Sequence, residues 1–158
     1  MPRPTDADWI GPLYDRYGAS LYRYAVMVLA DPAAAADVVQ TVFVSLLRSR
    51  ASPEFDERYL RRATRNECFS CLRKRRRDVL ASATPILETI EGRRDRPDER
   101  LALEKALRDL PAEQREAVHL KVFEGMTFQE IAELTNESIN TVASRYRYAI
   151  EKLRESLT

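Results

Sequence analysis

The side chains best placed for chemistry lie in the last third of the chain, and that chemistry is recognition of nucleic acid. Apolar residues recur there at helical spacing and predict a helix with one buried face: Ile139, Val142, Tyr146 and Ile150. The other face of that helix carries hydroxyl and guanidinium groups: Thr141, Ser144, Arg145 and Arg147. Such groups bind phosphates and base edges. We therefore expect this face to contact DNA.

The residues before this helix are suited to hold it against a second helix. Thr127 and Glu130 have the spacing of a capping box, so a helix is expected to begin there. Asn136 can adopt the left-handed conformation of a tight turn, and Ser138 can cap the next helix. The alternative is two ordinary core helices with a solvated face. Because two caps and a turn occur at matched spacing, we favour a helix-turn-helix, which places one helix in the major groove.

A second candidate site is a basic block in the middle of the chain. From Arg58 to Arg77 there are nine Arg or Lys residues and one acid, Glu67, although the whole chain has a net charge of only +1. A cationic block on an otherwise acidic protein indicates an anionic partner. Basic residues also complement the end of a helix dipole, which is the alternative explanation. The unbroken basic run from Arg73 to Arg77 exceeds what a helix end needs, so we favour the partner.

Enzymatic and metal chemistry find little support, so we expect a protein that is not an enzyme and has no metal or cofactor. A zinc site needs about four ligands, yet Cys68 and Cys71 are the only cysteines and His119 is the only histidine. A redox or zinc role for the cysteine pair is the alternative to a packing role, which we favour. There is no phosphate-binding glycine loop, and His119 has no convincing nucleophile partner.

The expected location is the cytoplasm, without membrane insertion. The longest apolar run, about residues 24–30, is far too short to span a bilayer. No apolar segment of a secretion signal follows the first residues, and two cysteines make no disulfide framework.

The predicted fold class is all-α, since 32% of the residues are charged and only 4 of 158 are Gly. Helices are expected over about residues 8–30, 31–49 and 52–78, then from Pro97 to Leu110 and from Pro111 to about Gly125, before the helix-turn-helix. Between them, residues 79–96 lose the helical pattern and predict a flexible linker. The chain is thus expected to form two small helical domains, residues 1–78 and residues 97–158, with the helix-turn-helix in the second.

Three segments, in this order along the chain, resemble the extracytoplasmic-function (ECF) sigma factors of bacterial RNA polymerase. This group is the smallest class of the sigma-70 family and keeps only regions 2 and 4. The segment Asp37-Val-Val-Gln-Thr-Val-Phe43 resembles the region 2.2 pattern of Asp, two aliphatic residues, Gln and Phe. Arg65-Asn66 and Leu72-Arg73-Lys74 resemble the basic helix that ends region 2. Four further segments resemble region 4: Leu110-Pro111, Arg115, Glu130-Ile131-Ala132 and Thr141-Val-Ala-Ser-Arg145.

The resemblance implies a sigma factor that binds core RNA polymerase and directs promoter recognition and transcription initiation. Its implied partners are core RNA polymerase, promoter DNA and an anti-sigma factor. The residues implied to contact core polymerase are Asp37, Gln40 and Phe43. Those implied to contact the minus-ten element are Tyr59, Arg62, Arg65, Asn66, Arg73, Lys74, Arg75, Arg76 and Arg77. Those implied for the minus-thirty-five element are Thr141, Ser144, Arg145, Arg147 and Tyr148.

Several positions depart from the family pattern. Tyr59 stands where the family often has Trp, and Ala143 and Tyr148 stand where relatives commonly carry Lys or Arg. The minus-ten preference therefore cannot be copied from a relative. For the minus-thirty-five element, the hypothesis is either a non-standard sequence or weak binding by the C-terminal domain alone. One alternative function is a dimeric helix-turn-helix regulator that acts without polymerase core, but no sensor pocket or dimerisation helix is evident. The other is a helical protein that binds only proteins, against which the basic block argues.

Overall fold

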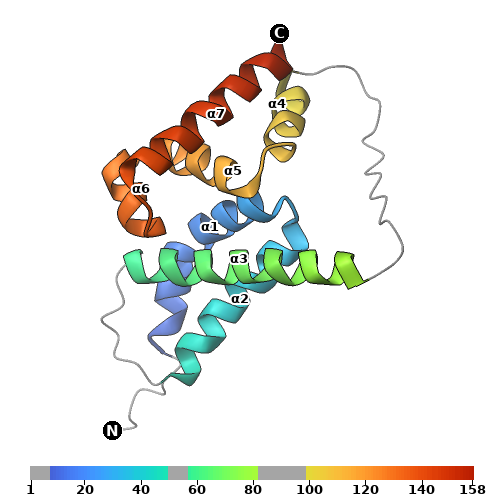
Figure 1. Cartoon of the computed structure of the whole chain (residues 1–158). Coiled ribbons are helices and arrows are strands. Elements are labelled where there is room, and N and C mark those ends of the chain that lie inside the picture. Colours follow the sequence, from blue (N-terminus) through green and yellow to red (C-terminus); the bar gives the residue numbers. More distant parts are fainter. Residues whose placement is uncertain (1–7, 50–56, 82–98) are drawn as a thin grey trace, which may run out of the picture.

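A computed structural model describes residues 8–49, 57–81 and 99–158, and in these residues all regular structure is helical (Figure 1). It contains seven α-helices and one π-helical segment, which confirms the predicted all-α fold class for the part described. Helices α1, α2 and α3 form an N-terminal unit, and α4 to α7 form a C-terminal unit that lies against α1 and α3 (Figure 1).

Helices α1 (Ile10–Leu29) and α2 (Pro32–Arg48) form a hairpin whose turn is set by local chemistry. Ala30 adopts a left-handed conformation with φ 52° and ends α1. Asp31 then caps α2, because its carboxylate accepts a hydrogen bond from the Ala34 amide at 3.1 Å and Pro32 follows at the first helical position. The predicted start of the second helix at Asp31-Pro32 is confirmed.

Helix α3 (Glu57–Ala81) crosses the hairpin and completes the core of the N-terminal unit. Leu60 and Cys68 lie on its buried side, where they share one apolar cluster with Val28 of α1 and Leu46 of α2. Cys68 is therefore a packing residue, as the sequence indicated.

The boundaries of α3 differ from the sequence prediction at one end. The predicted helix start, Ser52-Pro53, lies outside the described residues. At the other end α3 continues to Ala81, so residues 79–81, which were expected in the linker, form its last turn. The reason is compositional, since no Gly or Pro follows Asp78 before Pro85. The rest of the predicted linker and Pro97 also lie outside the described residues.

The C-terminal unit begins with two short helices separated at the predicted break. Helix α4 (Glu99–Arg108) ends before Leu110-Pro111, and α5 (Ala112–Val118) begins directly after it. The chain then continues from α5 into the π-helical segment η1 (His119–Phe123). Gly125 follows with φ 68°, a conformation that favours glycine, and closes the segment near the predicted helix end.

The predicted helix-turn-helix is confirmed by α6 (Phe128–Thr135) and α7 (Ile139–Leu157). Thr127 and Glu130 form the reciprocal capping box, with distances of 3.1 and 3.3 Å. Asn136 takes the left-handed conformation of the turn, with φ 55°. The Ser138 hydroxyl then caps α7 by accepting from the Thr141 amide at 3.1 Å.

The two units are packed together, which the sequence did not predict. Leu120, Ile131 and Leu134 of the C-terminal unit are buried in the same apolar cluster as Leu60 and Val28 of the N-terminal unit. Figure 1 shows α5 lying next to α1, and α6 next to the start of α3. The structure therefore shows a closed arrangement, a term we use below for this packing of the C-terminal unit on α1 and α3.

Candidate nucleic-acid interface

Helix α3 presents a stripe of arginines along one side. At 3.6 residues per turn, Arg58, Arg62, Arg65, Arg73 and Arg76 fall on the same side of the helix. Phe69 and Leu72 lie on this side between Arg65 and Arg73, so the arginines form one group at the start of α3 and one at its basic end. Two neutral candidates for minus-ten contacts, Tyr59 and Asn66, are exposed on the adjacent side.

The first half of this stripe faces carboxylates of the C-terminal unit. Arg65 forms an ion pair with Glu116 of α5, from Nε to Oε2 at 2.9 Å and from Nη2 to Oε1 at 3.3 Å. Its guanidinium also lies over the Phe69 ring, 4.6 Å from the centroid. The Glu116 side chain accepts a further hydrogen bond from the Tyr24 hydroxyl of α1. Glu116 is only 1% exposed, so this pair is a buried contact between the units.

Burial governs the titration of this cluster. Desolvation raises the pKa of Glu116, and the Arg65 charge and the Tyr24 hydrogen bond act in the opposite direction. Desolvation and the neighbouring Glu116 also raise the pKa of Tyr24, so its hydroxyl stays protonated and can donate. Buried carboxylates of this kind depend on their hydrogen-bond partners, because an unpaired one is costly.

A second contact joins Arg61 of α3 to Glu124, which follows η1. Arg61 donates to Glu124 and, from Nη2 at 2.9 Å, to Glu57 of its own helix. On its other side Glu124 lies 3.2 Å from Nε2 of His119, through Oε1. The hydrogen bond with His119, followed by that with Arg61, lowers the pKa of Glu124 to about 2 despite its partial burial. Glu124 is thus held as an anion at the interface.

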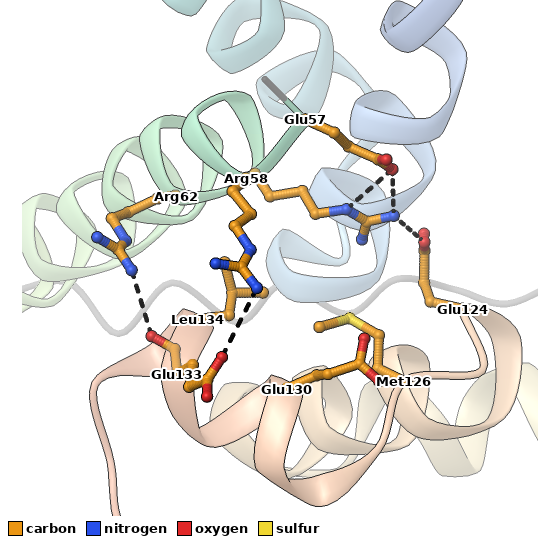
Figure 2. A pocket seen from close by; sticks show the side chains of 9 residues that line it. Glu57, Arg58, Arg62, Glu124, Met126, Glu130, Glu133 and Leu134 are labelled. Carbon is orange, nitrogen blue, oxygen red and sulfur yellow. Dashed lines mark hydrogen bonds and ion pairs between the residues drawn. The ribbon is translucent and has the colours of Figure 1, made fainter. Parts of the chain in front are cut away.

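A third contact involves α6 and leaves a cleft between the units. Arg58 approaches the Glu133 carboxylate at 3.8 Å, and Arg62 donates to the Glu133 carbonyl at 3.3 Å. Figure 2 shows Arg58 and Arg62 reaching from α3 towards Glu133 of α6. Met126 and Leu134 are among the residues that line the cleft. The cleft has a volume of about 320 Å³ and is lined by charged side chains of both units.

The basic end of α3 is not covered in this way. Arg73, Lys74, Arg76 and Arg77 are exposed. Arg75 lies on the inner side, where it pairs with Asp31 at 2.7 Å and donates to the Leu29 carbonyl at 3.4 Å. Of the unbroken basic run, Arg75 thus stabilises the α1–α2 turn, and the other four face solvent.

The predicted recognition helix, α7, divides its candidate residues between two sides. Arg147 and Tyr148 are exposed, with the guanidinium 5.5 Å from the ring centroid, and Ser144 is half-buried beside them. Arg145 lies apart from these and pairs with Glu137 at 3.2 Å. Thr141 accepts a hydrogen bond from the Ser138 hydroxyl at 2.9 Å.

The sequence reasoning missed one residue of the exposed side of α7. Asn140 is exposed and precedes Ser144 by one helical turn and Arg147 by two. An amide side chain at that position can hydrogen-bond to base edges. The signal was present in the sequence as the i, i+4, i+7 spacing of these three residues.

The candidate core-polymerase residues on α2 are likewise not equivalent. Asp37 and Gln40 are exposed on the side of α2 that faces away from the core, together with Val44 and Leu47. Phe43 is buried, at 6% exposure, and its ring packs edge-on against Tyr14 with centroids 5.1 Å apart. Phe43 therefore packs in the core beneath the exposed face of α2 and is not part of that face. Leu47, one turn beyond Phe43, is an apolar member of this surface that sequence reasoning missed.

Arg115 has a role that sequence analysis did not predict. It is buried in α5, and its guanidinium donates to the Met27 carbonyl at 2.8 Å and the Val28 carbonyl at 2.5 Å, at the end of α1. It also donates to the carbonyls of Arg108 and Leu110 at 2.9 and 2.6 Å. The last carbonyls of a helix lack partners within the helix. Arg115 thus caps α1 from the other unit.

Among the residues described, no arrangement of side chains is suited to metal binding or redox chemistry. No cluster of three or more His, Cys, Asp or Glu side chains suited to a metal occurs in them. Burial raises the pKa of the Cys68 thiol to about 12, which disfavours its reactive thiolate. None of the described helices has the length and apolar character needed to cross a membrane.

The fold and these surfaces define a helix-turn-helix DNA-binding protein with a second, basic helix in a separate unit. Comparison with known families gives the same division: residues 13–78 match Sigma-70 region 2, and residues 100–153 match Sigma-70, region 4. The chain is 32% identical to the ECF RNA polymerase sigma factor SigL of Mycobacterium tuberculosis, over 97% of this chain and 91% of that protein. It is also 32% identical to the RNA polymerase sigma factor CarQ of Myxococcus xanthus, over 92% and 87% of the two chains.

Solved structures show the same fold. The sigma factor RpoE from Bartonella quintana, in complex with the anti-sigma factor NepR, matches with a TM-score of 0.74 at 26% identity, over 93% of this chain and 95% of that one. CnrH, in complex with the cytosolic domain of CnrY, matches with a TM-score of 0.64 at 24% identity, over 94% and 86% of the chains. The protein belongs to the ECF sigma factors of the sigma-70 family, and its function is that of an RNA polymerase sigma factor.

Proposed function

We propose that this sigma factor uses three separate surfaces to bring core RNA polymerase to promoters. The exposed face of α2, with Asp37 and Gln40, contacts core polymerase. The arginine stripe and basic end of α3 contact the minus-ten element. The exposed side of α7, with Ser144, Arg147 and Tyr148, contacts the minus-thirty-five element. The protein itself has no catalytic role and acts where the polymerase is, in the cytoplasm.

The observation that carries this proposal is the separation of the three surfaces on one chain. Helix α2 buries Val38, Val42 and Leu46 and turns Asp37 and Gln40 outward. The basic end of α3 and the exposed side of α7 belong to different units. A factor with this arrangement can hold polymerase on one helix while two others reach DNA.

We further propose that an anti-sigma factor controls the protein. RpoE of Bartonella quintana was solved with the anti-sigma factor NepR, and this chain shares its fold over 93% of its length. The exposed apolar residues Val44 and Leu47, beside Asp37 and Gln40, offer a contact surface that such a regulator would have to cover in order to block polymerase.

The proposed function is tested by affinity capture of purified core polymerase, followed by transcription from a promoter library. We expect a one-to-one complex and transcripts that depend on this protein. Failure to bind core, together with a stable dimer that binds duplex DNA by itself, would instead identify a dimeric helix-turn-helix regulator. Sedimentation equilibrium separates the monomer from the dimer.

A further inference from the structure

We propose that Asn140 is a specificity-determining residue that recognises an adenine of the minus-thirty-five element in the major groove, while the methyl group of Ala143 contacts the thymine of the same base pair. The element that this protein selects then contains an A·T pair at the position that Asn140 contacts. This inference rests on the proposed function, because it takes the exposed side of α7 to be the surface that contacts the minus-thirty-five element.

The first argument is the position of Asn140. It is the second residue of α7, and the N-terminal residues of a recognition helix are those that contact base edges. Asn140 is exposed in the closed arrangement. The backbone around it is held in place, because Ser138 Oγ accepts from the Thr141 amide at 3.1 Å and the Val142 side chain is only 1% exposed. A side chain on a backbone held in this way can discriminate between bases.

The second argument is that neighbouring polar side chains of α7 already have partners. The Thr141 hydroxyl accepts from the Ser138 hydroxyl at 2.9 Å, and Arg145 pairs with Glu137 at 3.2 Å. The Asn140 amide, in contrast, forms no hydrogen bond with any residue that the structure describes. Both its oxygen and its NH2 group can therefore bind a DNA base.

The third argument is chemical complementarity. A primary amide has an acceptor oxygen beside a donor nitrogen, and adenine presents its N6 amino group beside the N7 acceptor in the major groove. The Asn side chain can thus accept from N6 and donate to N7 at the same time. Guanine presents two acceptors there, which suit Arg or Lys, and the cytosine N4 amino group suits a carboxylate. The neutral amide of Asn140 therefore favours adenine.

The side chain of Ala143 fits the same base pair. Ala143 follows Asn140 by three positions, so the two side chains are neighbours on the surface of α7. Thymine carries a C5-methyl group in the major groove, and the methyl group of an Ala can make an apolar contact with it. Ala143 is also short enough to leave the Asn140 amide free to approach the base edges. Together the two residues favour an A·T pair over a G·C pair.

Arg147 recognises a different base pair from Asn140. The two residues are seven positions apart, which is about 10 Å along the helix at about 1.5 Å per residue. Successive base pairs are about 3.4 Å apart, so two side chains at this spacing meet base pairs about three steps apart along the groove. Loss of the Asn140 amide should therefore change the base preference at one position and leave that due to Arg147 unchanged.

The experiment is transcription by holoenzyme, assembled from core polymerase and the full chain, on a pool of promoters with randomised minus-ten and minus-thirty-five windows. Each promoter carries a transcribed barcode, so sequencing the RNA gives the base preference at every position. Wild type is compared with Asn140→Ala, which removes the amide, and with Asn140→Asp, which keeps its shape but removes the donor. The matched control is Gln129→Ala, because Gln129 is an exposed amide on the other helix of the motif, where it donates to Glu133 at 3.1 Å.

We expect wild type and Gln129→Ala to select the same A·T pair at one position of the minus-thirty-five window. Asn140→Ala should lower the preference for that pair at least about fivefold, the smaller discrimination expected of a bidentate contact, and leave the other positions unchanged. Asn140→Asp should lose the same preference and favour cytosine in place of the adenine, because the cytosine N4 amino group donates to a carboxylate. If Asn140→Ala does not fold by circular dichroism, Asn140→Asp is judged by the same loss.

The proposal is overturned if Asn140→Ala keeps the wild-type preference at every position, or if the lost preference is for a G·C pair. It is also overturned if wild type directs transcription from the minus-ten window alone, a result that leaves core binding and minus-ten recognition intact. Transcription that does not depend on this protein at all refutes the proposed function, and this inference with it.

Discussion

Arg65 of α3 and Glu116 of α5 form an ion pair, with Nε and Oε2 2.9 Å apart, although 51 positions separate them in the chain. The pair joins the two units at a point where Glu116 is almost fully buried. A buried carboxylate without its partner is costly, so the contact is strongly specified once the units meet. An arginine that sequence resemblance assigns to DNA is thereby a structural contact of the closed protein.

Replacing Arg115 with Ala should destabilise the protein. Four carbonyl groups, two of them at the end of α1, would lose a charged donor in a buried site. We expect a loss of about 3 kcal/mol in the free energy of unfolding, because a hydrogen bond to a charged group contributes about 1.5–3 kcal/mol. The losses do not add fully, since water can hydrogen-bond to some of the four carbonyl groups in the variant. Urea unfolding measures the change.

Arg108→Ala is the matched control for Arg115, because its side chain is exposed while only its carbonyl takes part in the contact. Its stability should lie within about 0.5 kcal/mol of wild type. Equal losses for the two variants would show that Arg115 does not act through these carbonyls.

Stability should fall in acid in part through Glu124. The pKa of this carboxyl is lowered to about 2, chiefly by its hydrogen bond with His119 and then by Arg61. A folded-state pKa below the unfolded value means that the ionised group stabilises the protein above about pH 4.3 and loses this effect as the pH falls towards 2. Wild type should therefore lose more stability between pH 5 and pH 3 than Glu124→Gln does. Urea midpoints at the two pH values test this, and parallel losses would contradict it.

The exposed face of α2 should control affinity for core polymerase without controlling stability. Asp37→Ala/Gln40→Ala is expected to weaken core binding about tenfold, roughly 1.4 kcal/mol, with an unchanged melting temperature. Phe43→Ala should instead lower the melting temperature and leave core affinity nearly unchanged, because the buried Phe43 ring contributes about 3 kcal/mol to the stability of the fold. Binding titrations and thermal melts on the same samples separate the two. If Asp37→Ala/Gln40→Ala binds core polymerase with unaltered affinity, the exposed face of α2 is not part of the interface with core polymerase.

The basic end of α3 should determine how steeply promoter binding depends on salt. Replacing Arg73, Lys74, Arg76 and Arg77 with Gln removes four exposed charges, and the log–log slope on partly single-stranded promoter DNA should become shallower by roughly 3 units. Arg75→Gln is the contrasting variant, because Arg75 pairs with Asp31. It should keep the slope and lower the melting temperature. A normal slope in the fourfold variant would mean that this end of α3 is only a solvated helix terminus.

Local sequence determined the helices and the helix-turn-helix because the signals for them act within a few residues. The Thr127–Glu130 capping box, the left-handed Asn136 and the Ser138 cap each depend on neighbours three or four positions away. The Asp31-Pro32 start of α2 is of the same kind. Such hydrogen bonds form wherever the local chain adopts a helix end, so they can be predicted without tertiary structure.

Only the tertiary structure decided which charges are available and how the units sit. Arg65, Arg73 and Arg75 look alike in sequence, yet one pairs with Glu116, one is exposed and one pairs with Asp31. Phe43 shares a helical pattern with Asp37 and Gln40, but its ring lies against Tyr14. These outcomes depend on burial and on partners far away in the chain: 44 positions separate Arg75 from Asp31, and 92 separate Tyr24 from Glu116. The free energy of such a pair depends on desolvation and on three-dimensional geometry, and neither can be predicted from the spacing of residues along the chain.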